Sequence, residues 1–220
     1  MPLLVVTAVE AEADAIRSGL GGAGVTVAAV GVGPAAAAAG TARLLAIAES
    51  GGRAYDGVIS AGIAGGFPGR ADPGATVLAV RSIAADLGAD SPDGFLAIDE
   101  LGFGSATVHP DPTLHAALRA ALPSALVGDV LTVSTVTGTA ASAAALRRRH
   151  PRALAEAMEG YGVACGALTA GVPFAELRTI SNPIGPRDRT QWRIGDALAA
   201  LTAAGRALAA GPARSGSGRT

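Results

Sequence analysis

Short runs of aliphatic and β-branched residues alternate along the chain with longer alanine-rich stretches. Turn-forming residues bound the aliphatic runs, which is typical of buried strands. The alanine-rich stretches place their larger apolar residues at helical spacing. This pattern predicts strands at residues 3–9, 25–30, 57–60, 76–80, 129–133 and 173–180, and helices at residues 10–18, 34–48, 112–121, 140–149, 160–170 and 189–209.

Strands that alternate with helices favour a mostly parallel sheet that helices cover on both faces. We therefore expect an α/β fold, a single three-layer α/β/α domain formed by residues 1–209. Residues 210–220 are rich in Gly, Ser and Arg, and we expect a disordered tail there. A chain of 220 residues has room for one sizeable core but not for two full domains.

Charge and composition exclude several classes of function. The chain has 17 basic and 18 acidic residues, a balance that attracts neither nucleic acid nor an anionic membrane. Every basic residue is an arginine, so lysine-centred chemistry such as Schiff-base formation is excluded. The lone Cys165 forms no internal disulfide, and with three histidines it is a poor set of metal ligands, so we expect no metal.

Residues 18–42 carry no charge and superficially resemble a membrane span. Glycines and Pro34 interrupt this stretch, however, and its hydrophobic period changes, so two short buried elements explain it better. The N-terminus has no basic segment before its first acidic residues, which argues against a secretory signal. The cytoplasm is the expected compartment.

Two short segments resemble functional motifs without meeting their requirements. The turn Gly31-Val32-Gly33-Pro34 resembles half of a dinucleotide-binding fingerprint, but Ala36 stands where the third glycine belongs. No acidic residue ends a strand about 20 residues later, as that motif requires. Cys165 lies in an apolar helix without a nearby histidine, which favours burial over nucleophilic chemistry. We therefore expect no organic cofactor.

Polar and glycine-rich segments fall where sheets of this kind bind ligands, at the carboxyl ends of the predicted strands. Glu12 follows the first strand, Gly65 lies in the segment after the third, and Ser181 and Asn182 follow the last. Glu159 opens an almost wholly apolar helix. Two interpretations of Glu159 stay open: a partner of the helix dipole, or a bidentate acceptor of two sugar hydroxyls.

Four of these segments, in the same order, resemble motifs of the purine nucleoside phosphorylase/nucleosidase superfamily. They are Glu12, Gly62-x-Ala64-Gly65-Gly66, Met158-Glu159 and Arg178-Thr179-Ile180-Ser181-Asn182. The resemblance extends from residue 1 to about residue 208. It implies a nucleoside phosphorylase-like fold with a mixed, mostly parallel sheet, a purine nucleoside as ligand, and a homo-oligomer.

Within that superfamily, residues 86–95, 101–104 and 181–192 look like the futalosine hydrolase subgroup. This resemblance implies hydrolysis of the N-glycosidic bond of futalosine. The products would be hypoxanthine and dehypoxanthinyl futalosine, in the futalosine route to menaquinone.

The resemblance also implies roles for the matching residues. Glu12 would be the general base that activates water, and Glu159 would accept hydrogen bonds from the ribose 2′- and 3′-hydroxyls, with Met158 against the sugar. Asn182 would stabilise the departing purine. The remaining positions that would line the substrate pocket are Gly65, Val136 and Ser181.

Asn182 departs from the adenine-releasing relatives, which carry an aspartate there. An amide N–H₂ donates to the N7 and O6 acceptors of a 6-oxopurine, whereas an ionised aspartate only accepts and matches the N6 amino group of adenine. Asn182 therefore favours hypoxanthine or guanine. The alternative is a structural asparagine that caps the turn before Pro183.

A second departure concerns the nucleophile. Phosphorylases of the superfamily carry an arginine just before the glycine of the third-strand turn, whereas this chain reads Val58-Ile59-Ser60-Ala61-Gly62. Because phosphate needs an arginine or a cluster of donors, water is the favoured nucleophile. The alternatives are a phosphate-dependent purine nucleoside phosphorylase, another purine nucleosidase, and a nucleoside-binding domain without catalysis.

Futalosine carries a benzoate on its extended 5′ side, so an arginine that pairs with a carboxylate is expected near the sugar. Arg187 and Arg189 are the candidates, although an Arg-Asp-Arg segment before a helix also fits a surface cap. Phe95 and Phe103 are candidates for contact with the 5′ extension.

Overall fold

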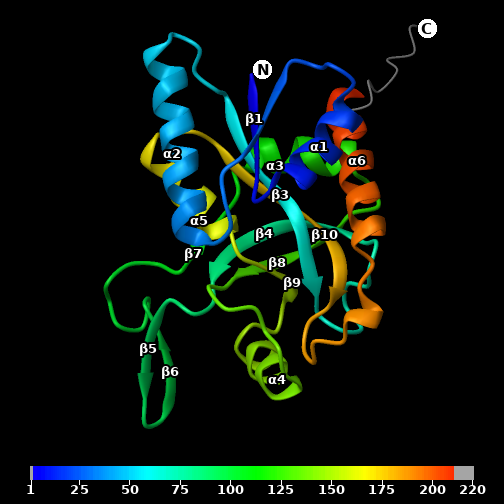
Figure 1. The fold of residues 1–220 in the computed structure, drawn as a ribbon. Coiled ribbons are helices and arrows are strands. Elements are labelled where there is room, and N and C mark those ends of the chain that lie inside the picture. The colour runs from blue at the N-terminus through cyan, green and yellow to red at the C-terminus, as the bar shows by residue number, and fades with distance from the viewer. Residues whose placement is uncertain (1, 211–220) are drawn as a thin grey trace, which may run out of the picture.

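The computed structural model describes residues 2–210 (Figure 1). Its main sheet contains β1 (Leu3–Thr7), β2 (Val25–Ala29), β3 (Gly57–Gly66), β4 (Thr76–Ala84), β7 (Thr107–Val108), β8 (Leu126–Thr132), β9 (Ala153–Ala157) and β10 (Phe174–Pro183). A separate hairpin is formed by β5 (Gly88–Ser91) and β6 (Gly94–Ala97). The helices are α1 (Glu10–Leu20), α2 (Pro34–Ser50), α3 (Pro112–Ala121), α4 (Ala140–Arg149), α5 (Gly160–Thr169) and α6 (Ile194–Ala210), with a 3₁₀ turn at Arg189–Gln191.

The sheet is mixed and mostly parallel, as expected. Strand β1 pairs in parallel with β2 and β3, β3 with β10, and β8 with both β4 and β9. The antiparallel pairs are β3–β9, β4–β10 and β4–β7. Because β10 pairs with both β3 and β4, the strands β3, β9, β8, β4 and β10 close into a ring. The sequence pattern did not predict this closure.

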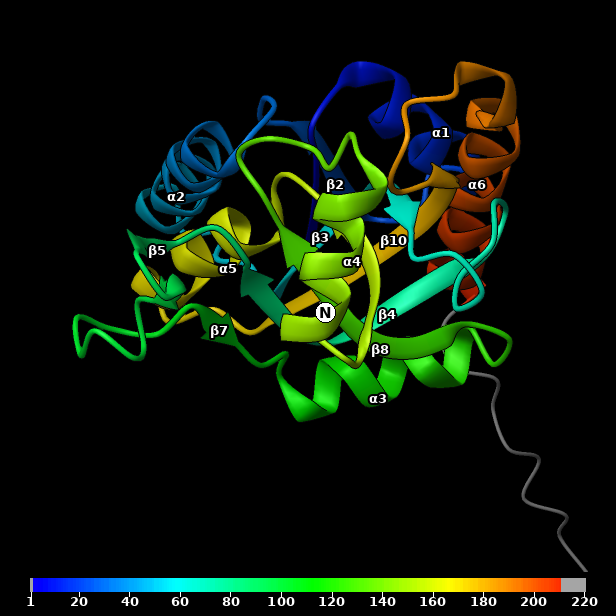
Figure 2. The ribbon, with the colours of Figure 1, turned by 90° about the horizontal axis from the view of Figure 1, so that it is seen from below.

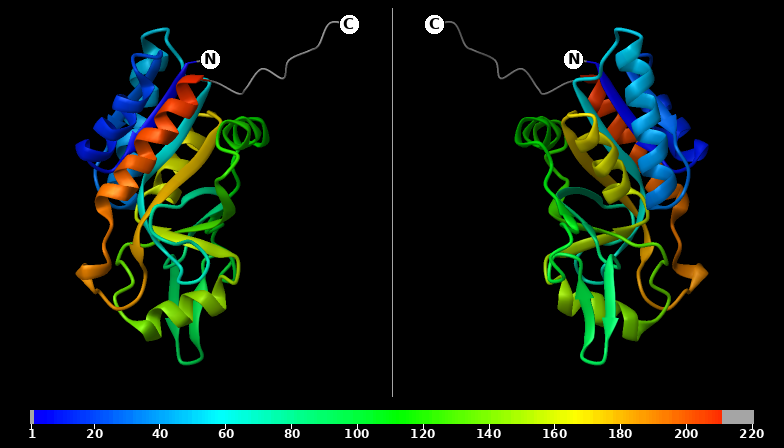
Figure 3. Two further views of the ribbon diagram at one scale, coloured as in Figure 1. Left: turned by 90° about the vertical axis from the view of Figure 1, so that its right-hand side faces the viewer. Right: turned by 90° about the vertical axis from the view of Figure 1, so that its left-hand side faces the viewer.

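Helices cover the sheet on both sides, which confirms the α/β class. Helices α1 and α6 pack together on one side and α2 and α5 on the other (Figures 1 and 2). Leu4 and Val6 of β1 face the α2–α5 layer, whereas the intervening Val5 joins the cluster of Ile16 and Leu201. This alternation is why a continuous apolar run such as β1 is buried on both faces. Helix α4 and the β5–β6 hairpin lie at the opposite end of the molecule from the N-terminus (Figure 3).

Several predicted boundaries were wrong, and two of them matter for the site. Strand β3 continues through the glycine-rich segment to Gly66, and β10 continues to Pro183. Gly65 and Asn182 therefore lie inside strands rather than in the turns after them. Strands β5, β6, β7 and β9 were not predicted.

The last predicted helix begins later than expected. Asp188 caps a single 3₁₀ turn, and α6 starts only at Ile194. Residue 210 ends α6, while the rest of the predicted tail, 211–220, lies outside the described residues. The uncharged stretch at 18–42 comprises the end of α1, β2 and the start of α2. Within residues 2–210, no helix combines the length and apolarity that a membrane crossing requires.

Candidate active site

A cavity of about 370 Å³ opens beside the carboxyl ends of β1, β3 and β10. This volume lies in the range of small-molecule sites. The sequence-predicted site residues all line it: Glu12, Gly65, Val136, Met158, Glu159, Ser181 and Asn182. The fold thus brings together seven residues that are up to 170 positions apart in the chain (182 − 12 = 170).

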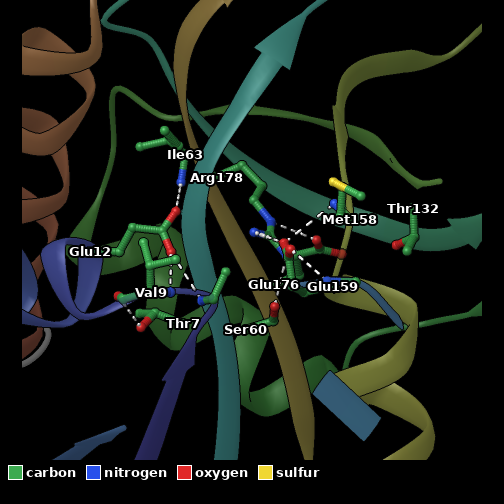
Figure 4. A network of polar contacts seen from close by, with 12 residues as sticks. Thr7, Val9, Glu12, Ser60, Ile63, Thr132, Met158, Glu159, Glu176 and Arg178 are labelled. Carbon is green, nitrogen blue, oxygen red and sulfur yellow. Dashed lines mark hydrogen bonds and ion pairs between the residues drawn. The ribbon is translucent and has the colours of Figure 1, made fainter. Parts of the chain in front are cut away.

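Backbone N–H groups hold the Glu12 carboxylate in place. Its Oε2 accepts from the N–H groups of Ala8 (3.0 Å) and Val9 (3.2 Å), and its Oε1 accepts from the N–H of Ile63 (2.8 Å) (Figure 4). Helix α1 therefore presents a buried carboxylate to the end of β3. Donors just after β1 and one donor within β3 fix the orientation of this carboxylate. A carboxylate held in this way suits proton abstraction from a bound water.

A fully buried arginine, Arg178 of β10, organises the acidic residues on the other side of β3 (Figure 4). Its Nε donates to Glu176 (2.9 Å), its Nη1 to Glu159 (3.2 Å) and its Nη2 to the hydroxyl of Ser60 (2.9 Å). The Ser82 hydroxyl also donates to Glu176. Each guanidinium nitrogen thus has a protein partner, and two buried carboxylates share one cation.

Burial and charge oppose each other in this cluster. Burial raises the pKa of Glu176 above its usual value, although Arg178 and the Ser82 hydroxyl act in the opposite direction. Burial alone would lower the pKa of Arg178, but the carboxylates of Glu176 and Glu159 outweigh it and raise that pKa. Arg178 therefore stays charged.

Glycine is required where these groups approach the backbone. A Cβ on Gly62 would lie 2.8 Å from both Nη1 of Arg178 and Oε1 of Glu12. A Cβ on Gly160 would overlap the Glu176 carboxylate. The glycine of the Gly62-x-Ala64-Gly65-Gly66 motif therefore leaves room for Glu12 and Arg178 to approach each other across β3.

The Glu159 side chain lies at the start of α5 and also lines the cavity. This residue is the N-cap of α5, yet its side chain makes no capping hydrogen bond to that helix. Its carboxylate instead accepts from the N–H of Gly33 (3.3 Å), from the N–H of Met158 (3.3 Å) and from Arg178. Both interpretations of Glu159 stay predictions, because a carboxylate at a helix N-terminus favours the helix dipole without a capping bond, and one that lines a cavity can accept from a ligand.

Asn182 lies at an irregularity in β10. The register with β3 shifts between Ile180 and Asn182, and such bulges redirect side chains. The Ser181 hydroxyl donates to Oδ1 of Asn182 (2.8 Å), and Nδ2 of Asn182 donates to the carbonyl of Pro183 (2.9 Å). Because an amide N–H₂ carries two donors, one N–H remains for a ligand in the cavity.

The candidates for the 5′ extension divide into two groups. Arg187 and Trp192 line the cavity, and the Arg187 guanidinium lies 5.5 Å from the centre of the Trp192 ring. Arg189 lies 5.6 Å from the same ring but does not line the cavity. Phe95 and Phe103 do not line it either: Phe95 stacks with Arg149, and Phe103 is 81% exposed.

Sequence reasoning assigned no role to Arg178 and overlooked Glu176 and Glu156. Glu176 and Arg178 alternate with buried apolar residues in β10, so a period-two pattern with paired opposite charges was the available signal. Glu156 lies on β9, a strand that was not predicted, and it lines the cavity.

Comparison with known proteins agrees with this geometry. A family model described as the phosphorylase superfamily matches residues 5–210. The chain therefore belongs to the phosphorylase superfamily, in agreement with the resemblance of its motifs. More narrowly, it belongs to the futalosine hydrolases: a protein of that name from Acidothermus cellulolyticus is 47% identical over 232 residues, covering 98% of this chain and 93% of that protein.

Further relatives bear the same name. A futalosine hydrolase from Streptomyces coelicolor is 60% identical over 152 residues, 69% of this chain, and the match spans just under two thirds of that protein, 64%. Among solved structures, futalosine hydrolase of Helicobacter pylori has a TM-score of 0.76 at 17% identity, covering 94% of this chain and 95% of that one. A 5′-methylthioadenosine/S-adenosylhomocysteine nucleosidase from Colwellia psychrerythraea, in complex with adenine, has a TM-score of 0.74 at 22% identity, covering 94% and 95%. These two structures share the fold.

Replacing the buried arginine tests the ion-pair cluster. We expect Arg178→Met to lower the free energy of unfolding by about 3–5 kcal/mol, because it leaves buried carboxylates without their cation. Burial raises the pKa of Glu176 and Arg178 lowers it, so removal of Arg178 raises this pKa further. As the pH rises, the variant must ionise a buried carboxyl that has lost its cation, so the deficit relative to the wild type should be smaller at about pH 5 than at about pH 8.

Urea unfolding followed by circular dichroism at both pH values measures the deficit. Arg17→Met is the control, because Arg17 pairs with Glu10 and Asp14 on the surface and its removal should leave stability near that of the wild type. A deficit for Arg178→Met that does not change with pH would contradict the assignment.

Proposed function

We propose that the protein hydrolyses the N-glycosidic bond of futalosine and releases hypoxanthine and dehypoxanthinyl futalosine, a step of the futalosine route to menaquinone. The observation that carries the proposal is a single cavity lined by Glu12, Glu159 and Asn182, in a chain that matches a futalosine hydrolase over 98% of its length. We also propose the cytoplasm as its compartment.

In the proposed reaction, the C1′–N9 bond lengthens first and positive charge develops on the ribose. Glu159, held by Arg178, accepts hydrogen bonds from the 2′- and 3′-hydroxyls. The electron pair of the broken bond passes to the purine, and the free N–H of Asn182 stabilises the charge that develops there. Glu12 takes a proton from water as the water oxygen bonds to C1′. The departing purine anion takes up a proton from solvent to give hypoxanthine, and Glu12 returns its proton to solvent.

Water suits this site better than phosphate. A phosphate dianion needs an arginine or several converging donors. Arg178, which lies beside Glu12 and Glu159, is fully buried and does not line the cavity, and its donors point to protein acceptors. Ser60, in the segment where phosphorylases carry their arginine, is one of those acceptors. These contacts support hydrolysis.

The lining of the cavity supports an apolar 5′ substituent that ends in a carboxylate. Val9, Val32 and Ile194 line the cavity with 42%, 55% and 42% of their surfaces exposed, and Trp192 and Arg187 line it as well. Apolar side chains in solvent at the mouth of a site favour coverage by a ligand or a partner. We propose that the benzoate of the substrate occupies this region and that a homo-oligomer completes it.

The proposal is tested by base release from futalosine in buffer with and without phosphate, with inosine in parallel, followed by chromatography. Hypoxanthine released from futalosine without phosphate, and little from inosine, is the expected outcome. Release that depends on phosphate would instead identify a purine nucleoside phosphorylase. Tight nucleoside binding without release would identify a binding domain.

The general base is tested by Glu12→Gln, which keeps the size of the side chain and one of the two oxygens that accept from backbone N–H groups, while removing the proton-accepting carboxylate. We expect kcat for futalosine to fall by about 10²–10⁴-fold with binding of the substrate largely intact. Single-turnover kinetics and equilibrium binding separate the two quantities. A Glu12→Gln variant with near-wild-type kcat would show that another group activates the water.

The carboxylate-binding residue is tested by Arg187→Met against the matched control Arg189→Met. Both arginines stack on Trp192 at nearly the same distance, 5.5 and 5.6 Å, but only Arg187 lines the cavity. We expect Arg187→Met to raise KM for futalosine about tenfold or more, since it removes a charge-assisted hydrogen bond, and to leave inosine kinetics unchanged. Equal effects of the two substitutions would refute the assignment.

A further inference from the structure

A buried carboxylate that the proposed reaction does not use lies behind the wall of the cavity. Glu176 of β10 is 1% exposed and does not line the cavity, whereas Glu159 lines it and is 6% exposed. Arg178 connects the two: its Nε donates to Oε1 of Glu176 (2.9 Å) and its Nη1 to Oε2 of Glu159 (3.2 Å) (Figure 4). Within residues 2–210, no other cation forms an ion pair with either carboxylate.

Three elements hold Glu176 in this position. Glu176 and Arg178 are two residues apart on β10, so their side chains lie on the same face of the strand. From β4, the Ser82 hydroxyl donates to Oε2 of Glu176. From α5, the backbone of Gly160 comes so close that a Cβ there would lie 2.0 Å from Oε1 of Glu176. The Glu176 carboxylate therefore has a fixed place against the first turn of the helix that begins after Glu159.

Glu176 and Glu159 compete for one positive charge. The contact of Arg178 with Glu176 is the shorter of the two. Burial and the charge of Glu159 raise the pKa of Glu176, whereas Arg178 lowers it, as expected for two buried carboxylates with a single cation. Because its cation is shared, Glu159 keeps more of its strength as a hydrogen-bond acceptor than it would in an exclusive ion pair.

We propose that Glu176 is a positioning residue that acts on Glu159 through Arg178. By taking part of the hydrogen bonding and charge of the guanidinium, it leaves the Glu159 carboxylate able to accept hydrogen bonds from ligand hydroxyls in the cavity. Without the charge of Glu176, Arg178 pairs more strongly with Glu159 and draws it away from the ligand. The inference rests on the proposed function, in which those hydroxyls are the 2′- and 3′-hydroxyls of ribose.

The test is the contribution of the ribose hydroxyls to binding, measured with two ligands that cannot be hydrolysed. 9-Deazainosine has a carbon–carbon glycosidic bond, and its 2′,3′-dideoxy analogue lacks both hydroxyls. Isothermal titration calorimetry gives the two dissociation constants. For the wild-type protein, we expect the dideoxy analogue to bind at least about tenfold more weakly, because hydrogen bonds to a charged acceptor are lost.

The variant Glu176→Gln removes the charge and keeps the size of the side chain. Its amide carbonyl still accepts from Nε of Arg178, and its N–H₂ donates to the Ser82 hydroxyl. We expect the ratio of the two dissociation constants to fall at least about threefold, because only the ligand with hydroxyls loses affinity. A merely structural role would weaken both ligands equally and leave the ratio unchanged.

Asp129→Asn is the matched control. Asp129 of β8 is a fully buried carboxylate that accepts from Nε of Arg81 (3.0 Å), and neither residue lines the cavity. This variant also removes one buried negative charge from an arginine pair, but the ratio for the two ligands should stay at its wild-type value.

Each outcome decides the question. A folded Glu176→Gln protein with the wild-type ratio would overturn the inference and leave the proposed function intact. A wild-type ratio near one would overturn the inference together with the proposed ribose contact of Glu159, while hypoxanthine release from futalosine is scored separately.

Thermal unfolding establishes whether the variants are folded. If Glu176→Gln does not fold, Ser82→Ala takes its place. The Ser82 hydroxyl lowers the pKa of Glu176, so its removal favours the uncharged carboxyl and should lower the same ratio. An unchanged ratio for folded Ser82→Ala would then refute the role of Glu176.

Discussion

The site depends on one buried cation. The guanidinium of Arg178 contacts Glu176, Glu159 and Ser60, and it reaches Glu12 across Gly62. Isolated carboxylates are too costly to bury in this number, and a shared cation reduces that cost. Because a guanidinium is planar and always protonated, it fixes the orientation of Glu159 as well as balancing its charge. The geometry of the cavity wall and the stability of the fold therefore depend on the same side chain.

Strand β3 connects the separate parts of this arrangement. It lies between β1, β9 and β10, and its glycines stand where functional side chains from those neighbours converge. Gly62 separates Glu12 from Arg178, and Gly65 separates Glu156 from Asn182. Two glycines of β3, three positions apart in the chain, thus lie between two pairs of polar side chains at or beside the cavity. The ring of strands gives these positions a rigid support.

Much of this was predictable from the sequence, for identifiable reasons. Continuous aliphatic runs such as 3–9 predict buried strands, and the site residues that the superfamily resemblance implied all line the cavity. Strand β9 was missed because its sequence, Ala-Leu-Ala-Glu-Ala, has no β-branched residue and favours a helix when read locally. Pairing with β3 and β8 overrides that preference. Because β9 was not predicted, Glu156 on this strand was overlooked as a cavity residue. The bulge at Ser181 also has no local signal.

Closure of the strands into a ring has a consequence for association. A strand with an unpaired side is a template for a further strand from another chain. Among the described strands of the main sheet, the ring occupies both sides of β3, β9, β8, β4 and β10, whereas β2 and the two-residue β7 each pair on one side only. At β2, Arg17 donates to the carbonyl of Val27 (2.9 Å), while its own charge is balanced by Glu10 and Asp14. A charged side chain at the unpaired side of β2 disfavours pairing with a strand of another molecule. Arg17 therefore protects this edge of an alanine-rich, aliphatic chain from edge-to-edge aggregation.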